Sequence, residues 1–201
     1  MKKYFWKLPA VFFICLSLTG CVKMALRFAP SFIPRLSQAF FEECDPALAK
    51  QSMPASLKLM EGLLKNDPDN RQILTSLCTA FTGYALLFVE EDDPESASSL
   101  YLRAREYGLK ALGPKAPLSK DATLNRDIIH DRLRSIGKGD LEALFWTTMA
   151  WNSWINLNLD KPAALGQLSA AQSCVKKVLE INPDYFFGAP YILESIYKTH
   201  C

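Results

Sequence analysis

The sequence has few of the residues, and none of the short motifs, on which most enzyme active sites depend. It contains two histidines, His130 and His200, among 201 residues. It contains no glycine-rich phosphate loop, no GxSxG nucleophile motif and no HExxH zinc motif. His130 lies between Ile129 and Asp131 and His200 is next to the last residue, so both are expected in solvated surface positions. We therefore predict a protein that is not an enzyme and that needs no cofactor.

Neither sign of charge dominates, and the alternation that is typical of strands is missing. The chain has 23 Lys and Arg against 21 Asp and Glu. Without residues 1–20, which hold three lysines and no acidic residue, the balance is 20 minus 21, or −1. Such a balance argues against a basic surface of the kind that binds nucleic acids, so we expect no nucleic-acid partner. No run alternates polar and apolar residues over a useful length, which predicts an all-α fold.

The first 21 residues have the order of an export signal. Lys2, Lys3 and Lys7 precede an apolar run at 8–18, about eleven residues long and too short to span a bilayer. The sequence Leu-Thr-Gly-Cys follows and ends at Cys21. This pattern resembles a bacterial lipobox, which implies removal of residues 1–20 as a signal peptide and attachment of lipid to Cys21. We therefore expect a lipoprotein that its lipid anchor holds on a membrane, facing the periplasm.

Two other interpretations of this segment are an uncleaved anchor helix and a buried first helix, and Pro9 and Gly20 weaken both. Val22 lacks the aspartate that commonly retains lipoproteins in the inner membrane of enteric bacteria, which favours the outer membrane over the inner. Residues 21–53 are expected to be a lipidated linker or first helix. Their apolar part, residues 22–41, lies either on the lipid surface or against the domain that follows.

Four cysteines remain after the signal peptide and the lipid-attachment residue, and they are far apart: Cys44, Cys78, Cys174 and Cys201. No CxxC pair or other metal-ligand spacing occurs among them, so we predict no metal site. Export would permit disulfides, but helical cores often hold free cysteines. We favour buried thiols over disulfide bridges.

Helical periodicity begins at Pro54, a residue that suits a first helical turn, and the segment 66–70 supplies a stop and an N-cap for the next helix. Residues 54–201 are predicted to form one helical domain. Apolar spacing and turn signals predict helices over 54–65, 71–89, 95–112, 122–136, 141–159, 162–181 and 185–197. Helix ends with proline turns recur at Pro68, Pro114 and Pro183, as in tetratricopeptide arrays. Because the gaps are 46 and 69 residues, we predict a degenerate tetratricopeptide-like α-solenoid.

The most informative chemistry is aromatic. Phe145, Trp146, Trp151 and Trp154 share the helix at 141–159 and are spread around much of its circumference. One interpretation is that they are simply core residues. The other is that some of them line an apolar cavity for a ligand. Polar side chains that could orient such a ligand are Tyr84, Arg103, Arg105, Tyr107, Asn152 and Asn156. Surface ion pairing is the ordinary alternative for the arginines.

Four segments together resemble the T component of TRAP transporters: 54–70, 97–112, 144–160 and 178–190. The resemblance covers most of the mature chain and includes the lipobox. It implies a periplasmic lipoprotein of tetratricopeptide-like helical hairpins, with a pore or cleft for an apolar ligand. It also implies partnership with a periplasmic TRAP substrate-binding protein, and a homotrimer. Chains of this family usually continue well beyond the Gly-Ala-Pro at 188–190, so we expect that C-terminal helices are lacking here.

Our leading hypothesis is a lipoprotein that binds an apolar or amphipathic small molecule and docks a substrate-binding protein for TRAP-type uptake. The alternative is a tetratricopeptide-like scaffold lipoprotein for envelope assembly, with no ligand and with tryptophans that serve only the core. A hydrolase or transferase is a distant third, which detectable turnover would revive.

Overall fold

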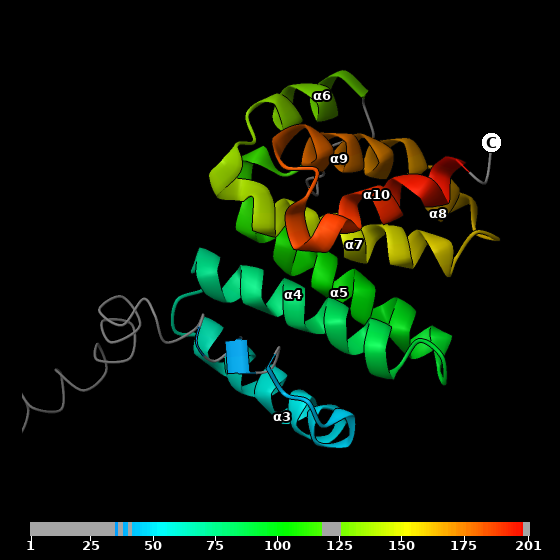
Figure 1. Cartoon of the computed structure of the whole chain (residues 1–201). Helices are drawn as coiled ribbons and strands as arrows, with labels where there is room; N and C mark the ends of the chain where they lie inside the picture. The colour runs from blue at the N-terminus through cyan, green and yellow to red at the C-terminus, as the bar shows by residue number, and fades with distance from the viewer. Residues whose placement is uncertain (1–34, 36–37, 40–41, 118–125, 199–201) are drawn as a thin grey trace, which may run out of the picture.

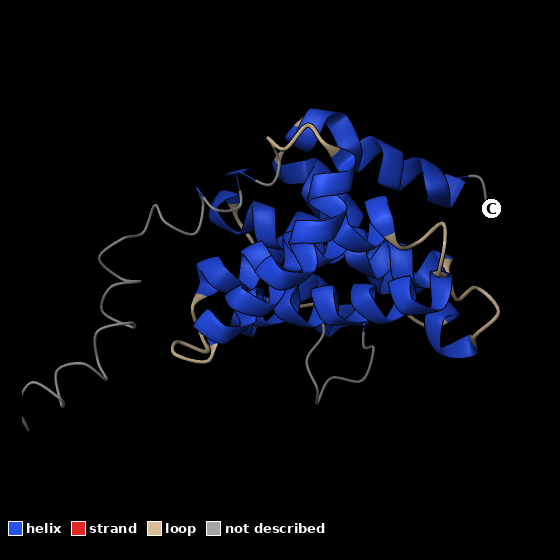
Figure 2. Cartoon of the chain, turned by 90° about the horizontal axis from the view of Figure 1, so that it is seen from below, coloured by secondary structure: helices blue, strands red, loops and turns tan. Residues whose placement is uncertain are grey.

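The computed structural model describes residues 35, 38–39, 42–117 and 126–198, and it confirms the all-α prediction (Figure 1; Figure 2). Within these residues the regular elements are α-helices and short 3₁₀ turns. In chain order they are α3 (Pro46–Leu64), α4 (Arg71–Phe88), α5 (Pro94–Leu112), η1 (Gly113–Lys115), α6 (Arg126–Arg134), η2 (Lys138–Asp140), α7 (Leu141–Asn156), α8 (Pro162–Leu165), α9 (Leu168–Ile181) and α10 (Tyr185–Lys198). The predicted signal peptide, Cys21 and Cys201 lie outside the described residues.

The prediction that the first helix of the domain begins at Pro54 is wrong. α3 begins eight residues earlier at Pro46, and Asp45 caps it by accepting hydrogen bonds from the backbone N–H groups of Ala47 (2.9 Å) and Leu48 (3.2 Å). Pro54 lies inside the helix, where it removes one backbone donor. Asp45 and Pro46 supply the cap and the first turn, so Pro54 does not mark the start of the helix.

Asparagine and aspartate caps start the next two helices, and the first of them lies in the segment 66–70 where the sequence predicts an N-cap. The side chain of Asn70 accepts a hydrogen bond from the Ile73 N–H at 3.1 Å, and that of Asp93 accepts one from the Ser96 N–H at 3.0 Å. α5 ends at Gly113, whose φ of 57° lies in the left-handed region that glycine tolerates.

α7 lies at the centre of the packing, with α4, α5 and α9 against it. Its buried residues lie all around the helix, as expected for a helix that neighbours cover on several sides. α5 approaches α4 and α7 closely at Gly108, where a Cβ atom would lie 1.9 Å from the Thr147 Oγ1 and 2.8 Å from the Cys78 Sγ. Only a glycine allows α4, α5 and α7 to meet at this distance.

Three predicted helix boundaries in the second half need correction. The helix expected over 162–181 is two helices, α8 and α9, and Gly166 and Gln167 lie between them. α7 ends at Asn156 rather than at Leu159, and Asn158 then donates to the Trp154 carbonyl at 2.7 Å. This hydrogen bond from the side chain takes the place of a backbone hydrogen bond to one of the last carbonyls of α7. The chain can therefore leave the helix without leaving that carbonyl unpaired. α6 covers residues 126–134 of the predicted 122–136, and residues 122–125 are outside the described part.

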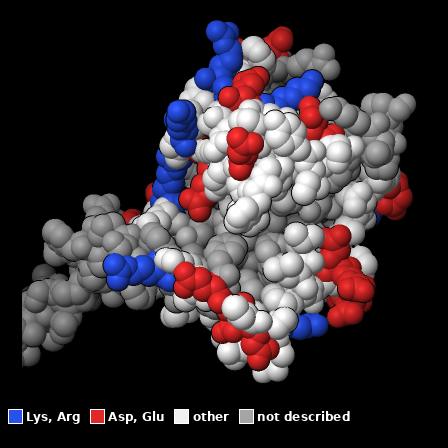
Figure 3. Space-filling model, viewed as in Figure 1, with Lys and Arg blue, Asp and Glu red and all other residues white. Residues whose placement is uncertain are grey.

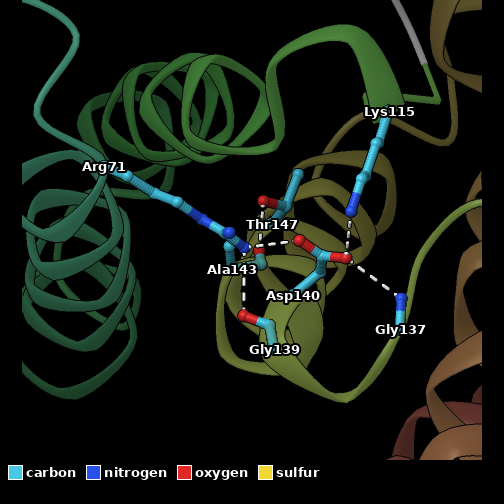
Figure 4. A network of polar contacts seen from close by, with 7 residues as sticks. All are labelled: Arg71, Lys115, Gly137, Gly139, Asp140, Ala143 and Thr147. Atoms are coloured by element: carbon cyan, nitrogen blue, oxygen red, sulfur yellow. Dashed lines mark hydrogen bonds and ion pairs between the residues drawn. The ribbon is translucent and has the colours of Figure 1, made fainter.

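Asp140 ties three parts of the chain together at the start of α7 (Figure 4). Its side chain is 6% exposed. One carboxylate oxygen accepts from Arg71 Nη2 at 2.6 Å, and the other accepts from Lys115 Nζ at 2.9 Å and from the Gly137 N–H at 3.0 Å. Arg71 also donates to the Gly139 carbonyl at 3.0 Å. The carboxylate thus joins the first turn of α4, η1 and the connection into α7.

The cysteines agree with the buried-thiol prediction at two positions and disagree at a third. Cys78 and Cys174 are free and buried, and burial raises the pKa of each thiol to about 12. Cys44 is free as well, but it is exposed. It lies before the start of α3, so no helix turns its side chain toward the core. His130 is exposed on α6, as predicted.

α10 carries four exposed large apolar side chains: Phe187 (99% exposed), Ile192 (66%), Tyr191 (53%) and Phe186 (40%). In the view of Figure 3, the surface where α7 and α10 lie has few charged residues. Phe186 and Phe187 have φ angles of 47° and 60°, so two aromatic residues occupy the left-handed region at the start of this helix. Among the described residues, no helix combines the length and apolar character needed to cross a membrane.

Candidate functional site

α5 directs two arginines to opposite sides. Residues two positions apart on an α-helix point about 200° away from each other. Arg103 therefore reaches α3 and α4, whereas Arg105 reaches α7 and the turn before α9. The two arginines form the centres of separate polar clusters, one on each side of the helix.

The first cluster joins α3, α4 and α5 around Glu61. This carboxylate forms an ion pair with Arg103, and its Oε1 accepts a hydrogen bond from the Tyr107 hydroxyl at 2.6 Å. Lys58 lies 3.1 Å from the other carboxylate oxygen. The Arg103 guanidinium lies 4.8 Å from the centre of the Phe81 ring, which stacks on Tyr107 with 5.8 Å between ring centres. Two of the predicted ligand-binding residues, Arg103 and Tyr107, are thus brought together.

The electrostatics of this cluster hold it in one protonation state near neutral pH. Burial raises the pKa of Glu61, but the hydrogen bonds from Tyr107 and Lys58 and the charge of Arg103 outweigh it and leave this pKa lowered. Burial and the hydrogen bond to Glu61 raise the pKa of Tyr107. Glu61 therefore stays ionised and Tyr107 stays protonated. The cluster is suited to orienting a bound polar group rather than to proton transfer at neutral pH.

A surface groove of about 430 Å³ runs beside this cluster along α5, and Arg103 is one of its lining residues. The complete lining is Glu95, Ser96, Ser99, Leu100 and Arg103. The volume lies within the usual range of small-molecule sites, which is about 300 to 1,000 Å³. The lining combines a charged residue of each sign with two hydroxyls and one leucine. A molecule with both a polar and an apolar part matches it best.

The second cluster lies where α5, α7 and the turn before α9 meet. The Arg105 guanidinium lies 5.2 Å from the Trp154 ring centre and 5.6 Å from that of Trp151. Gln167 Oε1 accepts hydrogen bonds from Arg105 Nη1 and from Trp151 Nε1, each at 2.9 Å. The two tryptophans, fully buried Trp151 and 8% exposed Trp154, are therefore core residues that also flank a cation.

The other predicted residues are separate from both clusters. Phe145 and Trp146 are buried and form an aromatic group with Tyr185 and Phe186, in which neighbouring ring centres are 5.0 to 5.8 Å apart. The buried Asn152 donates its side-chain N–H to the Thr148 carbonyl, one turn earlier in α7.

Tyr84 packs on Phe88 within α4, at 6.0 Å between ring centres. In the part of the chain that the structure describes, no group of three or more His, Cys, Asp or Glu is placed to hold a metal ion.

Four residues of the clusters, Lys58, Glu61, Phe81 and Gln167, were missed by sequence reasoning, and one of them could have been found. Glu61 lies four residues after Leu57, on the apolar stripe of α3, and a carboxylate at such a position signals a polar partner on a neighbouring helix. Phe81 resembles any other core aromatic. Gln167 lies in a turn between two helices that the periodicity had joined, so no pattern singles it out.

Comparison with protein families matches residues 42–201 to the TRAP transporter T-component. That match covers well over half of the chain. The chain belongs to the TRAP transporter T-component family. The resemblance seen in the sequence is thus confirmed. Both arginine clusters lie within the matched residues.

A curated relative of this chain comes from Treponema pallidum and is described as an uncharacterized protein. The two are 26% identical over 180 residues, which cover 81% of this chain and 56% of the relative. The chain thus spans little more than half the length of the relative that it matches.

Proposed function

We propose that this protein is a periplasm-facing lipoprotein that binds an apolar or amphipathic small molecule in a helical cleft and docks the substrate-binding protein of its TRAP system. The observation that carries the ligand-binding part is the groove along α5. Its single leucine and two serines lie beside an arginine that Glu61, Tyr107 and Phe81 hold in place. A fixed charge beside an apolar surface suits a ligand with a head group and a tail.

A substitution that fills the groove tests this proposal. Ser99 is exposed and lines the groove, so Ser99→Phe places a ring there without entering the core. After removal of residues 1–20, every tryptophan of the chain lies on α7, at positions 146, 151 and 154. We expect saturable changes in tryptophan emission when the secreted Cys21→Ser chain is titrated with a panel of lipids and hydrophobic acids. We expect Ser99→Phe to weaken this binding about tenfold or more, because the ligand would have to displace the ring.

The matched control is Lys110→Phe, which adds the same side chain at an exposed position of α5 outside the groove. It should bind the panel as the parent chain does. Equal binding by the parent chain and by Ser99→Phe would show that the groove is not the site. No saturable response to any ligand would contradict the ligand-binding function as a whole.

The lipid anchor is a separate part of the proposal, supported by the lipobox that ends at Cys21. The near-neutral mature charge leaves the lipid as the main source of membrane binding. We expect Cys21→Ser to move the exported protein from the membrane fraction to the soluble periplasmic fraction, as measured by immunoblotting after osmotic shock. Membrane retention of this variant would favour an uncleaved anchor. The outer membrane is the proposed location.

The helical pairs that short turns join, α3 with α4 and α9 with α10, support a tetratricopeptide-like array as the scaffold (Figure 1). A homotrimer is also part of the proposal, and light scattering of the purified chain would test it.

A second candidate function is a scaffold lipoprotein for envelope assembly without a ligand. The deep burial of Trp151 and Phe145, both 0% exposed, favours it because these side chains are accounted for by the core alone. Transporter proteins among the partners of the chain would favour the first function, and outer-membrane assembly proteins would favour the second.

A further inference from the structure

The outer face of α3 is uncharged and largely exposed, and it consists of Leu48, Ser52, Ala55, Leu59 and Gly62. These residues follow one another at intervals of four and three positions, which places them on one side of the helix. Leu48 is 52% exposed and Leu59 is 58% exposed. A Cβ atom added at Gly62 would meet nothing within 4 Å. Apolar residues at this spacing are typical of a surface on which another helix packs.

This outer face is separate from the surfaces that α3 already uses. Figure 1 shows α3 at the edge of the domain, and α4 is its main neighbour. Ala49 and Met60 each follow a leucine of the outer face by one position, so they point about 100° away from it, and both are buried. Glu61, two positions after Leu59, points about 200° away and reaches Arg103. The outer face is therefore directed neither into the core nor toward the groove along α5.

The segment that precedes α3 has the composition of a covering element. Residues 22–41 include twelve apolar residues and only three charged ones, Lys23, Arg27 and Arg35. The segment ends four positions before Asp45, the N-cap of α3. Connections between packed helices are usually about 2 to 8 residues long, and elements that are consecutive in the sequence usually lie side by side. The nearest apolar surface along the chain is therefore the outer face of α3.

The described residues at the end of this segment form the solvent side of a helical turn. Arg35, Gln38 and Ala39 are helical, and the Glu42 N–H donates to the Gln38 carbonyl at 3.0 Å. The Gln38 side chain also donates to the Glu42 Oε1 at 2.6 Å. All four residues are exposed, and their spacing of i, i+3, i+4 and i+7 places them on one side. Three of the four are polar, as expected for the outer side of an amphipathic helix.

We propose that residues 22–41 pack on the outer face of α3. In the sequence Leu36 and Phe40 are one helical turn apart and alternate with the exposed positions, so they supply the apolar side that such packing needs. Without this packing, both the segment and the outer face would leave apolar surface in water. Once lipid is attached to Cys21, the packing holds the domain close to its anchor without a free linker. That consequence rests on the proposed lipid attachment, whereas the packing does not.

Leu59→Glu in the secreted Cys21→Ser chain tests the packing. A charge at a 58% exposed position has little effect if water covers that position, but it is costly if residues 22–41 bury it. We expect this substitution to lower the midpoint of urea unfolding, followed by circular dichroism, by about 1 M. Leu165→Glu is the matched control, because it makes the same change at a 49% exposed leucine of α8. It should move the midpoint by less than about 0.2 M.

A second background identifies residues 22–41 as the cover. In the full chain that carries Leu36→Glu and Phe40→Glu, the segment should leave the outer face. Adding Leu59→Glu to that chain should then shift the midpoint by less than about 0.2 M. The comparison of Leu59→Glu with Leu165→Glu stands even if this background does not fold.

Three results would overturn the inference. An unchanged midpoint in Leu59→Glu would show that water covers the outer face of the lipid-free chain. An equal shift in both backgrounds would show that another part of the chain covers it. A shift that appears only at high protein concentration would assign the face to a second copy. The chain that is tested carries no lipid, so none of these results bears on the proposed lipid attachment at Cys21.

Discussion

Gly108→Ala is expected to destabilise the protein by about 3 kcal/mol, the upper part of the range for overpacked cores. The added methyl group would lie 1.9 Å from the Thr147 Oγ1 and 2.8 Å from the Cys78 Sγ. These neighbours are buried parts of α7 and α4 and are not the ends of flexible side chains. Relief therefore requires α5 to move away from both helices, and dispersion contacts along its length are lost. Urea unfolding followed by circular dichroism measures the change.

Gly83→Ala is the matched control for this prediction. Gly83 also lies inside a helix, α4, but a Cβ atom at this position meets nothing within 4 Å. Here the alanine should raise the free energy of unfolding by about 0.5 to 1 kcal/mol, because glycine is the poorer helix former. Equal effects of the two substitutions would show that helix propensity, not the close approach of α5 and α7, controls stability at Gly108.

Asp140→Ala is expected to cost about 2 to 3 kcal/mol. The substitution removes a carboxylate that accepts three hydrogen bonds, two of them from cations. A hydrogen bond to a charged group contributes about 1.5 to 3 kcal/mol. The total loss is smaller than the sum of these contributions, because the Arg71 and Lys115 side chains are 49% and 43% exposed. Water can hydrate their charges when the carboxylate is removed. Asp69→Ala, which removes a 91% exposed carboxylate 3.6 Å from Lys110, should leave unfolding unchanged.

The same carboxylate predicts a loss of stability in acid. Burial raises the pKa of Asp140, but the hydrogen bonds from Gly137, Lys115 and Arg71 outweigh it, so the pKa in the folded protein is lowered. The stabilisation is therefore complete above the ordinary pKa of an aspartate, about 4, and is lost as the pH falls through the folded value. The difference in unfolding free energy between the parent chain and Asp140→Asn should shrink below about pH 4. A difference that is constant from pH 7 to pH 3 would contradict this.

Long helices with clear caps could be predicted from the sequence, since periodicity and turn chemistry agree there. The segment 71–89 is an example: Asn70 caps α4 and its apolar stripe is buried. Pro54 misled because a proline usually marks a helix start, whereas here Asp45 and Pro46 had already started the helix. The apolar character of 162–181 hid the break at Gly166 and Gln167, because both flanking segments are helical in pattern.

The candidate site could be predicted only in its parts. Sequence reasoning singled out Arg103, Tyr107, Trp151 and Trp154 as chemically distinctive, but it did not show that they form two groups. Which arginine is neutralised depends on the partner that each reaches. Arg103 meets Glu61, 42 positions earlier in the chain, whereas Arg105 meets a glutamine 62 positions later. Such pairings follow from how α3, α5 and α9 pack, and no local pattern specifies them.

Co-purification from the native cells tests the central proposal, a TRAP-system lipoprotein, most directly. The chain carries an affinity tag at its C-terminus, is expressed at its natural level and is isolated after mild crosslinking, and its partners are identified by mass spectrometry. We predict recovery of a TRAP substrate-binding protein in amounts comparable to the chain itself. The same purification from cells that lack the gene for this chain should not recover that binding protein. Recovery of outer-membrane assembly proteins without any TRAP binding protein would contradict the proposed docking function.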